Sequence, residues 1–269
     1  MSIVYADQTV LITGASSGIG REFARALAAR GASVVLVARR HDLLNELAAE
    51  LRSAHGAAVE VIPCDLASPS TGADLRGAVA ERNVRITSLI NNAGFGTFGH
   101  FGDEDPERLE REIAVDVSAP VQLTSAFLPD LLAAGNGFLI NVASMAAYAP
   151  TPRMAVYGAS KAFVLNFTEA LWSELRGRGV TVFALSPGAT DTEFNTVVGT
   201  DDATAGARMR SAAEVVATAL THLDRRSPGP SVVDGVGNRL AAAMSKLVSR
   251  RTAVVLMDRL SAPGRRRPA

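Results

Sequence analysis

A tyrosine and a lysine lie four residues apart in the stretch AVYGASKAF, residues 155–163. On a helix this spacing places Tyr157 and Lys161 on one face, where both can point into the same cleft. A free phenol has a pKa of about 10, too high for ready proton exchange at neutral pH, and a neighbouring ammonium lowers it. The pair is therefore a candidate proton-transfer device. The spacing alone fits a buried phenol beside a surface lysine equally well.

A serine, Ser144, closes the apolar run FLINVAS, which we interpret as the end of a buried strand. Ligands of open α/β sheets bind at the carboxyl ends of the strands. A serine at this point is therefore placed to meet a substrate, and it joins Tyr157 and Lys161 as a candidate catalytic residue.

The elements that must position these residues alternate along the chain. The expected strands are 9–13, 33–38, 59–62, 86–91, 137–143, 180–185 and 231–236. The expected helices are 18–30, 40–54, 70–82, 106–133, 155–177 and 211–225. Near-continuous apolar runs are typical of strands covered on both faces. The pattern predicts an α/β fold, a single doubly wound Rossmann-type domain with a parallel sheet of about seven strands. Pro120 and Pro129 should kink or split the helical stretch 106–133.

Composition excludes several classes of function. The 269 residues are 48% hydrophobic and 20% charged, as in an ordinary globular chain, and the net charge of zero gives no reason to expect nucleic acid. The single cysteine, Cys64, allows no intrachain disulfide and suits a reducing compartment. Four scattered histidines offer no metal-ligand cluster. We find no secretory leader and no uninterrupted apolar span, and we expect a cytoplasmic protein.

Three glycines, Gly14, Gly18 and Gly20, lie between the first strand and the first helix in TGASSGIG. Glycine lets the chain turn tightly there and lets a pyrophosphate approach the backbone, while the free N–H groups of the helix start favour a negative charge. This predicts dinucleotide binding. The spacing is G-x3-G-x-G rather than G-x-G-x-x-G.

Four motifs in order resemble the short-chain dehydrogenase/reductase family, from about residue 8 to residue 236. They are TGASSGIG, NNAG at 91–94, SMAAYAPTPRMAVYGASK at 144–161 and SPGATDT at 186–192. The resemblance implies that Ser144 holds the substrate oxygen and that Tyr157 gives or takes its proton. It also implies that Lys161 lowers the tyrosine pKa and bonds the nicotinamide ribose, while hydride passes between cofactor and substrate carbon.

The end of the second strand, VVLVARRHD, bears on which nicotinamide cofactor is bound. Ala38 stands where NAD-preferring members of the family carry an acid, and Arg39 and Arg40 follow. Arginine can bond a 2′-phosphate in bidentate fashion, so we expect NADP(H) in preference to NAD. The alternative is that both arginines merely begin a solvated helix.

The full set of cofactor contacts that the resemblance and the glycine loop imply is Gly14, Ser16, Ser17, Gly18, Ile19, Gly20, Arg39, Arg40, Asp65, Leu66, Asn91, Ala93, Gly94, Tyr157, Lys161, Pro187, Gly188, Thr190 and Thr192. For Asp65, a residue that simply stabilises a turn is a competing interpretation.

One position departs from the family pattern. The family often places an asparagine on the long helix before the catalytic serine, where it shapes a water-linked proton path to the lysine. The matching position in EIAVDVSAPVQL is Asp116. A carboxylate can still accept hydrogen bonds from water, but it brings a negative charge near Lys161. Asp116 is kept as a candidate catalytic residue; the alternative is that backbone geometry alone supplies the water site.

A segment at about 190–210 follows the last motif and mixes apolar with polar residues. Phe194, Val197, Val198 and Met209 lie within it, and we interpret it as a lid over a hydrophobic carbonyl or alcohol substrate. An apolar loop packed on its own domain would look the same. The paired acids Asp201 and Asp202 are expected to be solvated.

The last stretch, 238–269, carries eight basic residues and one acid, a charge of +7 that leaves −7 on the body at 1–237. A basic amphipathic tail of this kind can lie on an anionic membrane. We expect instead a helix docked on the acidic body or on a partner subunit, with GRRRPA disordered. A homodimer or homotetramer, formed through 106–133 and 155–177, is what the family resemblance implies.

The sequence thus predicts an NADPH-dependent carbonyl reductase, or the reverse alcohol dehydrogenase, of the short-chain family. Ketones, steroid-like molecules and ketoacyl groups are the substrate classes considered. One alternative is a dinucleotide-binding regulatory or scaffold protein that keeps the fold without turnover. Another is an epimerase or dehydratase of the extended branch, which the glycine spacing and the single domain disfavour.

Overall fold

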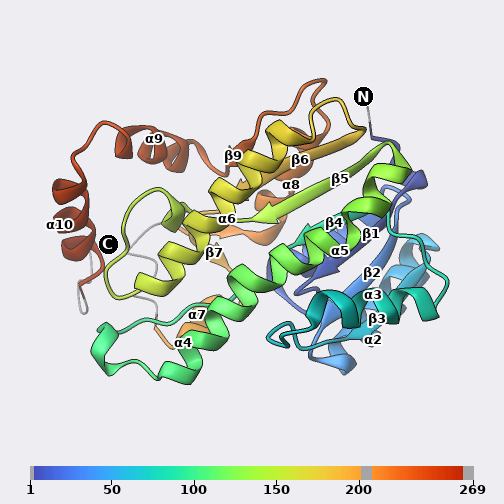
Figure 1. Ribbon diagram of the computed structural model, residues 1–269, viewed down its shortest axis with the longest axis horizontal. Helices are drawn as coiled ribbons and strands as arrows, with labels where there is room; N and C mark the ends of the chain where they lie inside the picture. The colour runs from blue at the N-terminus through green and yellow to red at the C-terminus, as the bar shows by residue number, and fades with distance from the viewer. Residues whose placement is uncertain (1–2, 201–207, 263–269) are drawn as a thin grey trace.

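Seven parallel strands form the middle layer of the molecule, in the order β3-β2-β1-β4-β5-β6-β9 (Figure 1). The computed structural model describes residues 3–200 and 208–262. The strands are β1 Thr9–Thr13, β2 Ser33–Ala38, β3 Val59–Pro63, β4 Ser88–Asn91, β5 Gly137–Val142, β6 Val180–Ser186 and β9 Ser231–Val233. This order confirms the predicted doubly wound Rossmann-type fold, with the chain reversing direction across the sheet between β1 and β4.

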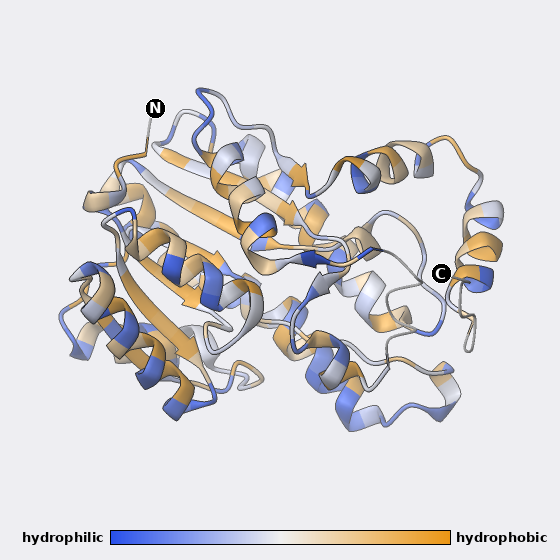
Figure 2. Ribbon diagram, turned by 180° about the vertical axis from the view of Figure 1, so that it is seen from behind, coloured by the Kyte–Doolittle hydropathy of each residue, from blue (hydrophilic) through white to orange (hydrophobic). Residues whose placement is uncertain are grey.

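Side chains that alternate along each strand build two separate cores. On β2, Val34 and Leu36 belong to one core and Val35 and Val37 to the other. The first core is closed by α1 Gly18–Ala28, α2 His41–His55 and α8 Ala212–Leu223. The second is closed by α3 Thr71–Glu81, α5 Ala119–Ala134 and the far end of α6 Ala155–Glu174. In Figure 2 the strands are predominantly hydrophobic and the outer helix faces hydrophilic, as this layering requires.

The long helical stretch predicted at 106–133 is divided into parts. It divides into α4 Pro106–Ile113, a π-helical turn at Ala114–Ser118, and α5. Pro120 lies in the first turn of α5, where its missing N–H costs nothing, and Pro129 lies inside α5 without ending it. The predicted split is therefore found just before Pro120, whereas Pro129 does not end α5. The turn that precedes Pro120 is widened around Asp116.

Short elements and an arm complete the structure. The predicted lid holds a two-stranded pair, β7 Thr190–Asp191 with β8 Arg210–Ser211, and α7 Phe194–Val198. Residues 201–207, with Asp201 and Asp202, lie outside the described residues, as does GRRRPA. Helices α9 Val236–Ser245 and α10 Arg250–Leu260 extend from the end of β9 as an arm beside α6 (Figure 1). Among the described helices, none combines the length and apolar character that crossing a membrane requires.

Candidate active site

A single continuous cleft follows the carboxyl ends of the strands and gathers most of the predicted site residues. The segments that leave β1 to β6 all contribute to its wall, at the edge where open α/β sheets bind ligands. Of the predicted cofactor contacts, those that line it are Gly14, Ser16, Ser17, Gly18, Ile19, Arg39, Arg40, Asp65, Leu66, Ala93, Gly94, Tyr157, Lys161, Pro187, Gly188, Thr190 and Thr192. The catalytic candidate Ser144 lines it too.

The glycine loop has the shape that close approach of a ligand requires. Gly14 and Gly18 have φ values of +67° and +53°, which side-chain-bearing residues rarely adopt. A Cβ on Gly14 would lie 2.8 Å from the Asn92 amide nitrogen. Ser17, the N-cap of α1, makes no side-chain hydrogen bond to the helix, so the N–H groups of the first turn are left for an anion in the cleft.

Two predicted contacts lie elsewhere. Gly20 sits inside α1, where its lack of a side chain lets the helix pack against the Gly14 carbonyl. Asn91 is buried in the sheet, and its amide donates to Asn141 Oδ1 at 2.9 Å and to Thr124 Oγ1 at 3.2 Å. Asn91 thus lies in the core and does not line the cleft. The next residue, Asn92, lines the cleft in its place.

Arginines occupy the cleft beyond the end of β2. Arg40 donates to Glu193 Oε2 at 2.7 Å and to Ser16 Oγ at 3.1 Å, so it is held over the glycine loop. Arg39 also lines the cleft and lies close enough to Asp65 to lower its pKa. Asp65 itself accepts from Arg111 at 2.6 Å and from the Ala67 amide at 3.1 Å. The turn interpretation of Asp65 is therefore correct, and its side chain is at the same time part of the cleft wall.

The four catalytic candidates meet where β5, the π-helical turn and α6 come together. Ser144 caps the short helical turn after β5 and interacts through its hydroxyl with the Tyr157 phenol. Lys161 Nζ lies 5.6 Å from the centre of the Tyr157 ring, on the same face of α6. It also donates to the Val142 carbonyl at 3.3 Å, at the end of β5.

Asp116 completes the group as a buried ion pair with Lys161. The distance from Lys161 Nζ to Asp116 Oδ2 is 3.0 Å, and the two side chains are 6% and 0% exposed. The other carboxylate oxygen accepts from the Phe95 amide at 3.0 Å. Gly94 packs directly on the pair, because a Cβ there would lie 2.8 Å from Lys161 Nζ and 3.0 Å from Asp116 Oδ2. The carboxylate that departs from the family pattern is thus in contact with Lys161.

Opposing effects set the proton affinities of these groups. Burial raises the pKa of Tyr157, and the Lys161 charge and the Ser144 hydroxyl act to lower it, with a net rise. Lys161 therefore acts to lower the pKa of Tyr157, as expected, but desolvation by burial is the larger effect. Burial acts to lower the pKa of Lys161. Asp116 and Tyr157 act in the opposite direction, and the net effect is that the pKa is raised and the ammonium form is favoured.

The far half of the cleft is apolar and comes largely from segments that sequence motifs did not indicate. The Phe194 ring lies 5.3 Å from the Tyr157 ring, between centroids. The C-terminal arm forms the opposite wall. The arm residues that line the cleft are Asn238, Ala241, Met244, Ser245, Val248, Ala253, Leu256, Met257 and Leu260. The arm is fastened by Arg153, which pairs with Asp258 at 3.0 Å.

The described part of the predicted tail, residues 238–262, therefore docks on the body and lines the cleft. Its amphipathic pattern indicated an apolar face, but sequence spacing could not show that this face covers the site. Within residues 3–200 and 208–262, no cluster of histidine, cysteine or acidic side chains is arranged to hold a metal ion.

Comparison with known proteins identifies relatives of this arrangement. The family model described as short chain dehydrogenase matches residues 8–203. A solved short-chain dehydrogenase from Sphingobium yanoikuyae, in complex with NADPH, is 37% identical with a TM-score of 0.80, over 93% of this chain and 95% of its own. The bulky-bulky ketone specific alcohol dehydrogenase from Comamonas testosteroni is 33% identical with a TM-score of 0.74, over 89% and 93%. A sulfoacetaldehyde reductase of Chromohalobacter salexigens is 38% identical over 80% of this chain and 83% of its own.

Proposed function

The chain belongs to the short-chain dehydrogenase family of oxidoreductases, and we propose that it interconverts a bulky hydrophobic ketone and its alcohol with NADP(H). The observation that carries the proposal is the contact set of Tyr157, Lys161 and Asp116. Lys161 and Asp116 are buried as a pair beside the half-buried Tyr157. Tyr157 and Lys161 both line the cleft, which runs from the glycine loop to an apolar chamber. A dinucleotide-binding protein without turnover would not require a phenol beside a buried ammonium at this point.

The residues present fit a dinucleotide. The uncapped start of α1 and the open backbone at Gly14 suit a pyrophosphate, and Lys161 and Thr192 lie farther along the same cleft, toward the nicotinamide end. The bound cofactor supplies the hydride. Ser144 positions the carbonyl oxygen, Tyr157 transfers a proton to it, and the Lys161 ammonium stabilises the phenolate left behind.

Charge at the end of β2 supports NADPH over NADH. Ala38 places no carboxylate there. Arg39 lines the cleft and has no hydrogen bond or ion pair within the described part of the chain, while Arg40 is already paired with Glu193. We expect Arg39→Asp to lower the ratio of NADPH to NADH affinity by about a hundredfold, since a charge-assisted bidentate contact is replaced by repulsion. Dissociation constants from cofactor fluorescence measure this ratio. Arg82→Asp, at an arginine outside the cleft, is the control. An unchanged ratio in Arg39→Asp would contradict the assignment.

The chamber beyond Tyr157 supports a large apolar substrate. Met145, Met154 and Phe194 line it together with Met257 and Leu260 of the arm. The known relatives include both a bulky-ketone enzyme and a reductase of the small anion sulfoacetaldehyde. The apolar lining favours a bulky ketone as the substrate. A sulfonate group bound there would lose its hydration without gaining polar contacts in return.

Substitution in the arm tests this substrate class. We expect Met257→Gln to lower kcat/KM for a bulky aryl ketone by about tenfold, the loss typical of one apolar contact in a substrate pocket. A small ketone, which does not reach the arm, should be unaffected. Val255→Gln on the exposed side of the same helix is the matched control. Equal losses for large and small ketones would show that the arm does not line the substrate chamber.

The direct assay follows the absorbance of NADPH with a panel of aryl ketones, steroid ketones, ketoacyl thioesters and sulfoacetaldehyde. We expect the highest kcat/KM with a bulky uncharged ketone. Highest activity with sulfoacetaldehyde would overturn the substrate class while leaving the oxidoreductase intact. Cofactor binding without oxidation by any carbonyl would favour the non-catalytic alternative.

A further inference from the structure

A second buried acid lies one turn before Asp116. Glu112 is the one fully buried side chain of α4, a helix whose residues are all described, and it is 0% exposed. Among the described residues, neither of its carboxyl oxygens has a hydrogen-bond partner of ordinary geometry, although Thr97 faces them. An unpartnered buried carboxylate is costly, so its presence calls for a physical reason. The mechanism derived above does not use it.

The position of Glu112 along the helix connects two places. Asp116 follows it by four residues through the π-helical turn and contacts Lys161. Leu109 precedes it by three residues and lines a small hollow on the protein surface, together with Thr97 and Glu104. Leu109, Glu112 and Asp116 therefore follow one side of this helical stretch, with Glu112 between the hollow and the buried ion pair.

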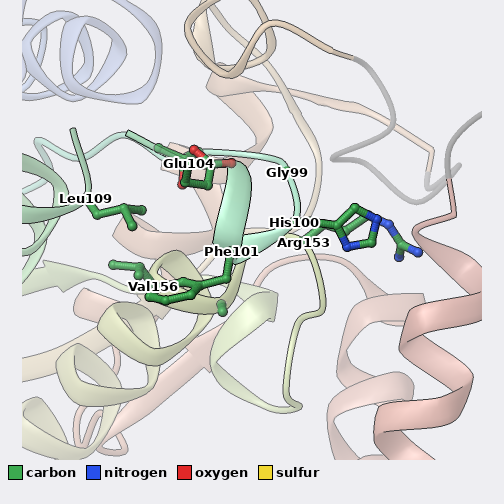
Figure 3. Close-up of a pocket in the computed structure, with 9 residues that line it drawn as sticks. Gly99, His100, Phe101, Glu104, Leu109, Arg153 and Val156 are labelled. Atoms are coloured by element: carbon green, nitrogen blue, oxygen red, sulfur yellow. The ribbon is translucent and has the colours of Figure 1, made fainter. Parts of the chain in front are cut away.

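The hollow brings the protein surface close to Thr97, the neighbour of Glu112. In Figure 3, Glu104 and Leu109 lie on one side of it and His100 with Arg153 on the other. Glu104 is half-buried and its charge reaches the Glu112 carboxyl. Thr97, with 3% of its surface exposed, lies between the hollow and the Glu112 carboxyl.

We propose that Glu112 carries the proton that restores Tyr157, receiving it from water at the hollow and passing it through Asp116 and Lys161. Each reduction of a carbonyl consumes one proton at the substrate oxygen, supplied by the Tyr157 hydroxyl. The phenolate then takes a proton from the Lys161 ammonium. Glu112 in its acid form gives its proton to Asp116 by way of a water molecule, Asp116 gives one to Lys161, and the Glu112 carboxylate is reprotonated from water. In alcohol oxidation the same steps run in reverse.

The surroundings of Glu112 favour a carboxyl group that gains and loses a proton near neutral pH. Burial and the neighbouring Asp116 raise the pKa of Glu112 to about 7, with a smaller contribution from Glu104. A relay group works best when its pKa lies near the working pH. The other titratable groups that face this cluster are Lys161 and Tyr157 on α6. Glu112 touches no reacting atom and acts through Asp116, so it is a positioning residue rather than a catalytic one.

The role rests on the proposed function and is tested by variants that keep the shape of the site. We expect Glu112→Gln to lower kcat for ketone reduction about tenfold with KM unchanged, and to remove an inflection near pH 7 from the kcat profile. Glu112→Met, which also holds no proton, should behave alike, whereas Glu112→Asp should recover part of kcat. Glu110→Gln, exposed on the same helix, is the matched control.

A measurement without turnover separates the two proposals. In protein carrying glutamate labelled with carbon-13 at the side-chain carboxyl, NMR should show one resonance that titrates near pH 7 and is absent from Glu112→Gln. Its absence from the wild-type spectrum overturns the role of Glu112. That role is equally overturned if wild type reduces ketones and Glu112→Gln keeps the pH profile of Glu110→Gln. A wild type that turns over no carbonyl defeats the proposed function, and the relay with it.

Discussion

Replacing Tyr157 with phenylalanine should reduce kcat by about 10²–10⁴-fold, the usual contribution of a positioned general acid. The substitution removes one oxygen at the floor of the cleft and leaves the ring beside Phe194 in place. The glycine loop is untouched, so the dissociation constant for NADPH should not change. Steady-state rates with the best ketone of the panel, together with cofactor titration, measure both quantities.

Phe194→Leu is the control for a change in the same contact without loss of the phenol. It keeps an apolar side chain against the Tyr157 ring and should retain most of kcat. Full turnover by Tyr157→Phe would show that a group other than Tyr157 donates the proton to the substrate oxygen. Loss of NADPH binding in the same variant would mean that the cleft itself had changed shape, which the packing around the ring does not predict.

Replacing Lys161 should lower both the stability of the fold and the rate of turnover. Lys161→Met should lower the free energy of unfolding by about 3–5 kcal/mol, because it leaves the Asp116 carboxylate buried without its partner. It should also reduce kcat by about 10²-fold or more, since the phenolate of Tyr157 loses the adjacent charge that stabilises it. Denaturant unfolding and steady-state rates provide the two readouts.

A double variant separates these two consequences. Adding Asp116→Asn to Lys161→Met removes the unpaired charge, so most of the lost stability should return while kcat stays low. Asp116→Asn alone restores the residue that the family often has and should keep measurable turnover. If the double variant were as unstable as Lys161→Met, the 3.0 Å contact between the two side chains would not be the source of the effect.

The sheet and most of the cleft could be predicted because they rest on short-range patterns. Apolar residues continue along β1, β2 and β5 because both faces are covered, and each motif follows directly after its strand. Asn91 shows the limit of this reasoning. It and Asn92 are adjacent polar residues, but consecutive residues at the end of β4 point in opposite directions, so only the second reaches the cleft.

The parts that could not be predicted depend on contacts between distant segments. The segment ERLEREI has the charge pattern of a solvated helix, and nothing in it marks Glu112 as buried, since the cause is packing against Thr97 and the start of α6. The π-helical turn at 114–118 has no distinct composition. The arm was identified as amphipathic, but its place over the cleft depends on contacts such as that of Arg153 with Asp258.

We propose that hydride passes in this cleft from NADPH to a carbonyl carbon while Tyr157 supplies the proton. NADPH carrying deuterium at both C4 positions of the nicotinamide, incubated with the wild-type protein and a bulky ketone, tests this most directly. Mass spectrometry of the product should show one deuterium on the new carbinol carbon, and Tyr157→Phe should form almost none of this product. Alcohol without deuterium, or labelled alcohol formed equally well by Tyr157→Phe, would contradict the account.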